Sequence, residues 1–184
     1  MIFQKLALNL ITTICRGALF SDKLFTKLSD KIIEGGLSME KIEKALESFK
    51  KGYNCSQSVF SAYSDIFNVD RNTALLIASG LGGGIGRTGN VCGAVTGAVL
   101  ILGLKYGFFK EDEIDLGKER VYSKVKEFLK RFEEENKSII CKELIGVDIE
   151  TEEGLKKAKE EKIFGNICPK FVESACKILE EMIK

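Results

Sequence analysis

Apolar residues recur every three or four positions along most of this chain, the spacing that gathers them on one face of an α-helix. Two clear runs are Val121, Val125, Phe128, Leu129 and Phe132, and Phe171, Ala175, Ile178, Leu179 and Met182. The strict alternation of apolar and polar residues that marks a half-buried strand is nearly absent. The pattern therefore predicts an all-α fold.

Glycines and capping residues divide this pattern into separate helices. The predicted helices cover residues 4–18, 22–34, 39–51, 55–67, 71–80, 92–106, 112–135, 140–145, 152–163 and 169–183. No repeat or low-complexity linker separates them. We therefore expect a single-domain multi-helix bundle with a glycine-rich loop over residues 38–184, preceded by an apolar helical extension over residues 1–37.

The N-terminal segment is apolar but does not have the pattern of a signal peptide. Its run from Leu6 to Cys15 contains three polar residues, is too short to span a membrane, and is followed by no convincing cleavage site. We expect a helix that packs on the domain or on a second copy of the chain, which would favour a homodimer. A role in export or at a membrane surface is the alternative.

Composition narrows the functional classes. Of 184 residues, 45% are hydrophobic and 30% charged, which is typical of a soluble globular protein with a core. The 28 basic and 27 acidic side chains leave no basic surplus, so we exclude a nucleic-acid binder. Six cysteines in a chain long enough to fold without disulfides predict a reducing cytoplasm, with thiols used for metal or redox chemistry.

The chain contains no histidine. This excludes a serine–histidine or cysteine–histidine nucleophile pair, an imidazole metal ligand, a Rieske-type cluster and a histidine-ligated haem. Acidic residues are abundant, but they fall on amphipathic helix faces and form no acid–base constellation. We therefore expect an electron carrier or redox accessory protein rather than a hydrolase or transferase, with chemistry carried by thiols or a bound cofactor.

Four of the six cysteines fall in the predicted first turns of helices: Cys55, Cys92, Cys141 and Cys168. A helix N-terminus carries about half a positive charge, which lowers a thiol pKa. Four such ends would supply about +2, against the charge of about −2 on an oxidised 2Fe–2S cluster with four thiolates. Cys15 and Cys176 lie inside helical patterns and are interpreted as packing residues.

The spacing of these four cysteines does not by itself indicate a metal site. None of them forms the Cys-x-x-Cys or Cys-x4-Cys pairs of zinc ribbons and ferredoxins. Four unrelated buried thiols remain an open alternative at this point.

A glycine-rich segment runs from Gly80 to Gly89 and contains a formal Gly-x-Gly-x-x-Gly at Gly84, Gly86 and Gly89. We reject a dinucleotide loop because no alternating α/β pattern surrounds it. Glycine here predicts close backbone approach. The loop leads into Cys92, so we expect Gly86 to help bind a cofactor through backbone amides and Arg87 to act as a nearby cation. Gly97 and Gly103, in the next helix, predict tight helix packing.

Five segments resemble a known family: Tyr53–Val59, Gly82–Gly86, Cys92–Gly97, Cys141–Gly146 and Cys168–Val172. Together they are similar to the C_GCAxxG_C_C family of redox-active proteins, over roughly residues 39–183. The second block of the family name reads Gly-Cys-Ala, whereas this chain has Cys92-Gly93-Ala94.

The resemblance implies a small helical protein whose four cysteines bind a redox group, most simply an iron–sulfur cluster of the 2Fe–2S type. Split-Soret cytochromes share the module and add covalent haem, which this histidine-free chain cannot hold in that way. The leading hypothesis is therefore electron transfer or redox sensing with an unidentified redox partner. Two alternatives stay open: a thiol–disulfide oxidoreductase that uses two of these thiols, and a helical binding module stapled by zinc.

Overall fold

Capping side chains start several helices close to the predicted positions. The Asn54 side chain accepts a hydrogen bond from the Gln57 amide at 2.9 Å, and the Gln57 side chain accepts one from the Asn54 amide, which begins α3 (Cys55–Tyr63). Asp70 caps α4 (Arg71–Ile77), and Thr151 caps α9 (Glu152–Glu160). Local polar chemistry therefore sets these three boundaries.

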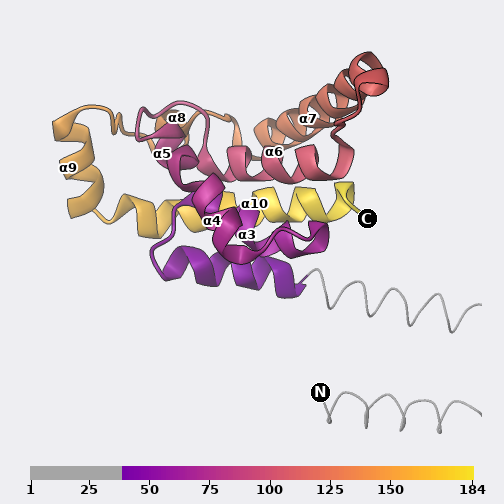
Figure 1. The fold of residues 1–184 in the computed structure, drawn as a ribbon. Coiled ribbons are helices and arrows are strands. Elements are labelled where there is room, and N and C mark those ends of the chain that lie inside the picture. The colour runs from indigo at the N-terminus through magenta and orange to yellow at the C-terminus, as the bar shows by residue number, and fades with distance from the viewer. Residues whose placement is uncertain (1–38) are drawn as a thin grey trace, which may run out of the picture. The chain divides into compact units, whose positions relative to one another are not determined.

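The computed structural model describes residues 39–184, which form one set of helices joined by short loops (Figure 1). The first helix of this range covers residues 39–50. The others are α5 (Gly82–Ile85), α6 (Gly93–Tyr106), α7 (Ile114–Asn136), α8 (Cys141–Ile145) and α10 (Ile163–Met182), with 3-10 turns at Ser64–Phe67, Ser79–Leu81 and Glu111–Glu113. Over this range there is no strand, only an isolated antiparallel bridge between Val91 and Ile140. The predicted all-α fold is confirmed.

The core is built around α3, α6 and α10, which start at the same end of the molecule (Figure 1). Fully buried side chains on these helices include Val59, Tyr63, Ile101, Leu102, Val172 and Leu179. At Gly97 a Cβ atom would lie 2.7 Å from the Ser56 carbonyl oxygen, so glycine is needed where α6 crosses α3. The expected close packing at Gly97 is confirmed.

The same expectation at Gly103 is wrong. A Cβ atom there would meet nothing within 4 Å, and the residue is exposed. Six residues after Gly97, Gly103 lies about 240° further around the helix and so faces away from α3.

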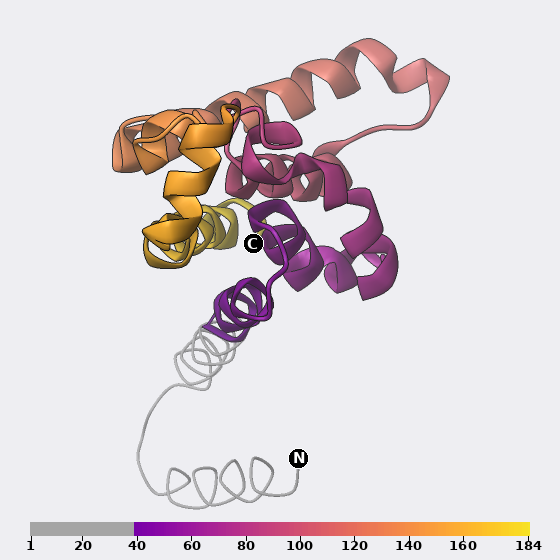
Figure 2. The ribbon, with the colours of Figure 1, turned by 90° about the vertical axis from the view of Figure 1, so that its left-hand side faces the viewer.

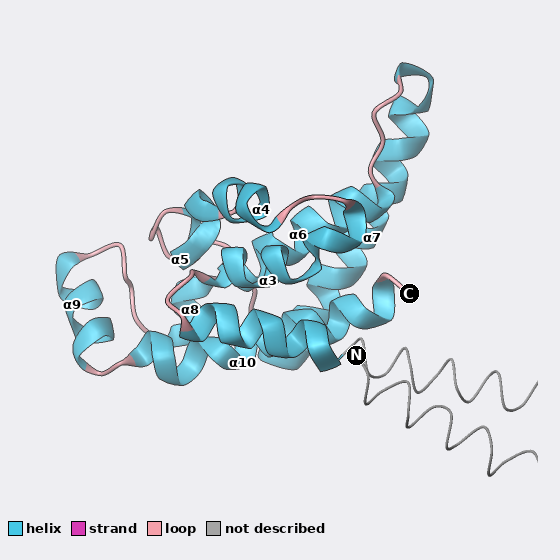
Figure 3. Ribbon diagram, turned by 60° about the horizontal axis from the view of Figure 1, so that its bottom comes forward, coloured by secondary structure: helices cyan, strands magenta, loops and turns pink. Residues whose placement is uncertain are grey.

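The long helix α7 packs one half of its length on the core. Phe128 and Phe132 are fully buried, and their rings stack with centroids 6.1 Å apart. The connection from α6 to α7 extends away from the packed centre (Figure 3), and Phe109 in that connection is exposed. In the described part of the chain, no single helix is both long enough and apolar enough to cross a membrane. The α6 and α7 segments meet that length and apolarity only when they are taken together, and this pair is bent by 110°.

The C-terminal helix α10 follows α9 after a sharp change of direction (Figure 2). It begins earlier than predicted, at Ile163 instead of residue 169. Lys162 adopts a left-handed conformation (φ 53°) that separates α10 from α9, which leaves Pro169 inside the helix. Proline removes one amide, so the carbonyl of Gly165 loses its helical partner. Gly165 is exposed, so water can satisfy this carbonyl. The predicted helices over residues 4–18 and 22–34, and Cys15, lie outside the described residues.

Candidate functional site

Four cysteines that are distant in sequence come together in the structure. The four are Cys55, Cys92, Cys141 and Cys168. In every pair of them, at least one thiol shifts the pKa of the other, so each of the four interacts with the other three. Cys176 does not belong to this group, since the side chains that act on its thiol are Tyr63, Glu180 and Glu173. Four of the five cysteines in the described part of the chain therefore lie at one place.

Cys55 and Cys92 meet because two helices start side by side. Cys55 is the first residue of α3, and Cys92 is the N-cap of α6. A Cβ atom on Gly93 would lie 3.0 Å from the Cys55 Cβ and 3.1 Å from the Ser56 amide nitrogen. Glycine at position 93 therefore allows the two helix ends to approach each other.

A short antiparallel contact holds Cys141 beside Cys92. The Cys92 amide donates to the Ile139 carbonyl at 2.8 Å, and the Cys141 amide donates to the Asn90 carbonyl at 2.6 Å. These bonds flank the bridge between Val91 and Ile140. Successive side chains of an extended chain point to opposite faces. Cys92 and Cys141 directly follow the two bridged residues, so their side chains point to the same face. Both thiols therefore face a common space.

Cys168 reaches the group from the second turn of α10. It was expected near a helix start, and that expectation is wrong because α10 begins at Ile163. Only three of the four cysteines stand at helix starts, and α8 is only five residues long. The positive charge from helix ends is therefore at most about +1.5 instead of about +2.

Burial and mutual repulsion keep most of these thiols protonated. Burial raises the pKa of Cys92 to about 11 and, with the charges of Cys92 and Cys168, that of Cys141 to about 12. The amides of Ala94 and Val95 act in the opposite direction and lower the pKa of Cys92, as expected at a helix N-terminus.

Cys55 and Cys168 form a hydrogen-bonded pair with opposite pKa shifts. Cys55 donates to the Cys168 sulfur, so the pKa of Cys55 rises well above its usual value, first through this bond and then through burial. The same bond lowers the pKa of Cys168. Cys168 is therefore the thiol of this group that deprotonates most readily.

Within residues 39–184, no basic side chain balances the charge of the four thiols. No lysine or arginine of residues 39–184 is among the groups that shift their pKa values. Lys142 follows Cys141 directly, but its Nζ atom pairs with the Asp148 carboxylate at 3.1 Å. Over the same residues, no three Cys, Asp or Glu side chains stand in the arrangement of a finished metal site.

The glycine-rich loop wraps tightly around its own backbone. Gly83, Gly84, Ile85, Gly86 and Arg87 all have positive φ angles, between 62° and 71°, so the chain makes a left-handed turn. A Cβ atom on Gly84 would lie 2.5 Å from the Asn90 nitrogen. The predicted close backbone approach at this loop is confirmed, and at Gly84 the group approached is the loop's own backbone.

Gly86 and Arg87 lie on the exposed side of this loop. The Gly86 amide donates to the Gly80 carbonyl at 2.9 Å, and the Arg87 amide donates to the Gly82 carbonyl at 3.4 Å. Both residues are exposed. Their amides are therefore used within the loop, and a role in cofactor binding stays a prediction for these two residues.

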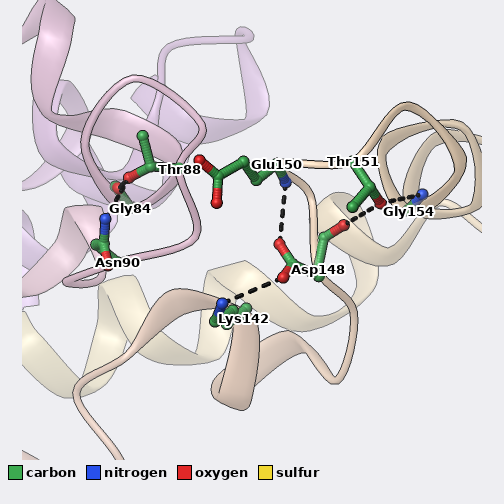
Figure 4. Close-up of polar contacts among 8 residues, drawn as sticks. All are labelled: Gly84, Thr88, Asn90, Lys142, Asp148, Glu150, Thr151 and Gly154. Carbon is green, nitrogen blue, oxygen red and sulfur yellow. Dashed lines mark hydrogen bonds and ion pairs between the residues drawn. The ribbon is translucent and has the colours of Figure 1, made fainter.

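Polar contacts brace the loop and, separately, the segment after Cys141 (Figure 4), and a backbone hydrogen bond joins the two. Thr88 donates to the Gly84 carbonyl and accepts from the Asn90 side chain. On the facing segment the Lys142 amide donates to the Gly89 carbonyl at 3.0 Å, and Asp148 accepts from both Lys142 and the Glu150 amide. Sequence reasoning missed Asp148, although an acidic residue in the polar stretch after Gly146 is a typical turn signal.

Comparison with known proteins identifies one family. The family model described as "Putative redox-active protein (C_GCAxxG_C_C)" matches residues 53–182, which is more than two thirds of the chain and includes all four clustered cysteines. No curated protein and no solved structure matches.

Proposed function

The chain belongs to the C_GCAxxG_C_C family of redox-active proteins, and we propose that it transfers or senses electrons through an iron–sulfur cluster of the 2Fe–2S type. The ligands are Cys55, Cys92, Cys141 and Cys168. The observation that carries the proposal is the pairwise interaction of these four thiols from four separate segments. When bound, such a cluster accepts and releases one electron.

The chemistry of the donor set fits this group. Four thiolates are the ligand set of a 2Fe–2S cluster, and the chain has no histidine to offer instead. These thiols raise one another's pKa, and no lysine or arginine from residues 39–184 acts on them. They therefore need a bound cation to stay deprotonated together. Iron supplies that positive charge.

The protein's own groups prepare the site in three ways. The amides of Ala94 and Val95 stabilise negative charge on the Cys92 sulfur. Cys92 and Cys168 are only 3% and 5% exposed, so little water reaches them. Cys55 is partly exposed and marks the side from which a redox partner exchanges electrons.

A second candidate is thiol–disulfide exchange, which the Cys55–Cys168 hydrogen bond favours. In that reaction the Cys168 thiolate attacks a substrate disulfide and releases one substrate thiol. Cys55 then attacks the mixed disulfide and releases the second thiol. Two protein thiols are oxidised to a disulfide, and the substrate disulfide is reduced by the same two electrons.

Metal and sulfide analysis separates these candidates. Protein purified without oxygen is assayed for iron, acid-labile sulfide and zinc, and its visible absorption is recorded. The proposal expects about two iron and two sulfide ions per chain and a visible spectrum. Protein with no iron, no sulfide and one fast-reacting thiol would favour the disulfide reaction. Stoichiometric zinc would identify a structural zinc site instead.

A further inference from the structure

The short segment over residues 138–140, just before α8, fixes the positions of two clustered cysteines relative to each other. Its Ile139 carbonyl accepts from the Cys92 amide at 2.8 Å. Directly after it, the Cys141 amide donates to the Asn90 carbonyl at 2.6 Å. These two hydrogen bonds join the segment to the start of α6. A shift of the segment would therefore move Cys141 relative to Cys92.

The antiparallel bridge leaves one amide of this segment without a partner on the facing chain. Val91 and Ile140 are the bridged residues, and the hydrogen bonds are made by the residues on either side of them. In this pattern the amides of the bridged residues point away from each other. Ile140 is partly buried, and a backbone amide that is shielded from water needs another acceptor.

The hydroxyl of Ser138 is that acceptor. The Ile140 amide donates to the Ser138 Oγ atom at 2.9 Å, and Ser138 is only 8% exposed. The same hydroxyl donates to the carboxylate of Glu143, in the first turn of α8. An acidic side chain at the third position of a helix commonly reaches back to the residues before the helix. One hydroxyl thus joins the backbone before α8 to its first turn.

Ser138 acts on the thiol site through the backbone and not by contact with a thiol. The pKa of Cys141 is raised by burial and then by Cys92 and Cys168, and neither Ser138 nor Glu143 is among the causes. Residues that orient metal ligands without touching the metal commonly change metal affinity by about 10–100-fold.

We infer that Ser138, held by Glu143, is a positioning residue that sets the placement of Cys141 beside Cys92 for binding a thiophilic metal. The inference rests on the proposed function, because it takes both cysteines as ligands. Without the hydroxyl, the Ile140 amide loses its acceptor, and leaving such a group unpaired is costly. The segment then shifts to bring this amide to water, and the Cys141 sulfur moves with it.

Cobalt(II) titration of the full chain, reduced and freed of metal, tests this inference, because cobalt–thiolate absorption depends on the number and geometry of the sulfur ligands. The parent is expected to bind cobalt with intense thiolate absorption. Ser138→Ala is expected to bind about tenfold or more weakly, with an altered spectrum. Ser138→Thr keeps the hydroxyl, and Glu143→Gln keeps an acceptor for it. Both are expected to bind cobalt as the parent does.

Asp70→Ala is the matched control. The Asp70 side chain accepts from the amides of Asn72 and Thr73 at the start of α4, which carries no cysteine. Its loss should lower stability without changing cobalt affinity. Equal losses of affinity in Asp70→Ala and Ser138→Ala would show general destabilisation and overturn the inference. Weak cobalt binding by Ser138→Thr, or none by the parent, would overturn it as well.

Failure of the proposed function gives a different result. Protein purified without oxygen that holds no iron or sulfide, yet shows the expected cobalt series, would remove the cluster and keep the role of Ser138. Iron and sulfide in the parent, with unchanged cobalt affinity in Ser138→Ala, would keep the cluster and remove the role of Ser138. Circular dichroism of each variant establishes that the helices are still formed.

Discussion

The thiol of Cys55 donates a hydrogen bond to the sulfur of Cys168, which raises the pKa of Cys55 and lowers that of Cys168. Eight residues further along the same two helices, the Tyr63 hydroxyl donates to the Cys176 carbonyl at 3.4 Å. Because both contacts advance by the same number of residues, α3 and α10 run parallel and in register (Figure 1). The parallel pair brings one cysteine of α10 to the thiol site and places the other in the core.

Replacing Cys55 tests this hydrogen bond. In protein freed of metal and kept reduced, Cys55→Ala removes the donor, so the pKa of Cys168 should rise toward the value that burial alone would give. Thiolate absorbance in the ultraviolet, recorded against pH, should then begin to appear at a higher pH than in the parent. Cys176→Ala is the control and should leave this first step in place. An unchanged first step in Cys55→Ala would contradict the pairing.

The raised thiol pKa values predict a loss of stability in alkali. Burial raises the pKa of Cys92 to about 11 and that of Cys176 to about 12, from an ordinary value of about 9. The stability from keeping them protonated is full below about pH 9 and is lost as pH rises toward the folded-state pKa. Each such thiol lowers the free energy of unfolding by up to about 1.4 kcal/mol per pH unit.

Urea unfolding of the reduced, metal-free protein at about pH 8, 9 and 10 measures this slope. Cys176→Ala should show a shallower fall above about pH 9 than the parent, because one of the contributing thiols is gone. A free energy of unfolding that stays level or rises over the last of these steps would contradict the assignment.

The start of α3 should matter to both stability and the thiol site. Asn54→Ala removes the capping box that begins this helix at Cys55, at a cost of about 0.5–2 kcal/mol. We expect a lower content of bound iron as well, since Cys55 loses its fixed position. Thr151→Ala removes the cap of α9, which carries no cysteine, and should lower stability without lowering iron content. Equal loss of iron in both variants would contradict a specific role for Asn54.

The glycine-rich loop can be tested through its strained residue. Ile85 has a φ of 64°, which is unfavourable for a β-branched side chain, and it is substantially exposed. Ile85→Gly should raise the free energy of unfolding by about 1 kcal/mol by relieving this strain. Leu76→Gly, at an exposed position in α4, should lower it by about 1 kcal/mol. Denaturation that finds Ile85→Gly less stable than the parent would contradict the left-handed turn.

The sequence predicts the helices better than it predicts their meeting points. Asn54 has a local signal that places the start of α3 correctly, and Cys176 falls on an apolar stripe that correctly indicates the core. Pro169 misleads, because a proline tolerated inside α10 looks the same in sequence as a proline that begins a helix. Because Cys168 is not at a helix start, only three helix ends, not four, contribute positive charge near the thiols.

The proximity of the four cysteines cannot be obtained from their spacing. It depends on the parallel register of α3 and α10, on the absence of a side chain at Gly93, and on the bridge between Val91 and Ile140. These are contacts between distant segments, for which the sequence offers no local pattern.

Two cysteines of one helix provide the most direct test of the account. Cys168 and Cys176 are both buried in α10, eight residues apart, and only Cys168 belongs to the thiol site. The visible absorption of Cys168→Ala and Cys176→Ala, isolated without oxygen, is compared with that of the parent at equal protein concentration. We predict that Cys168→Ala loses the iron–sulfur absorption and Cys176→Ala keeps it, whereas an intact spectrum in Cys168→Ala, or its loss in Cys176→Ala alone, would contradict the assignment of the ligands.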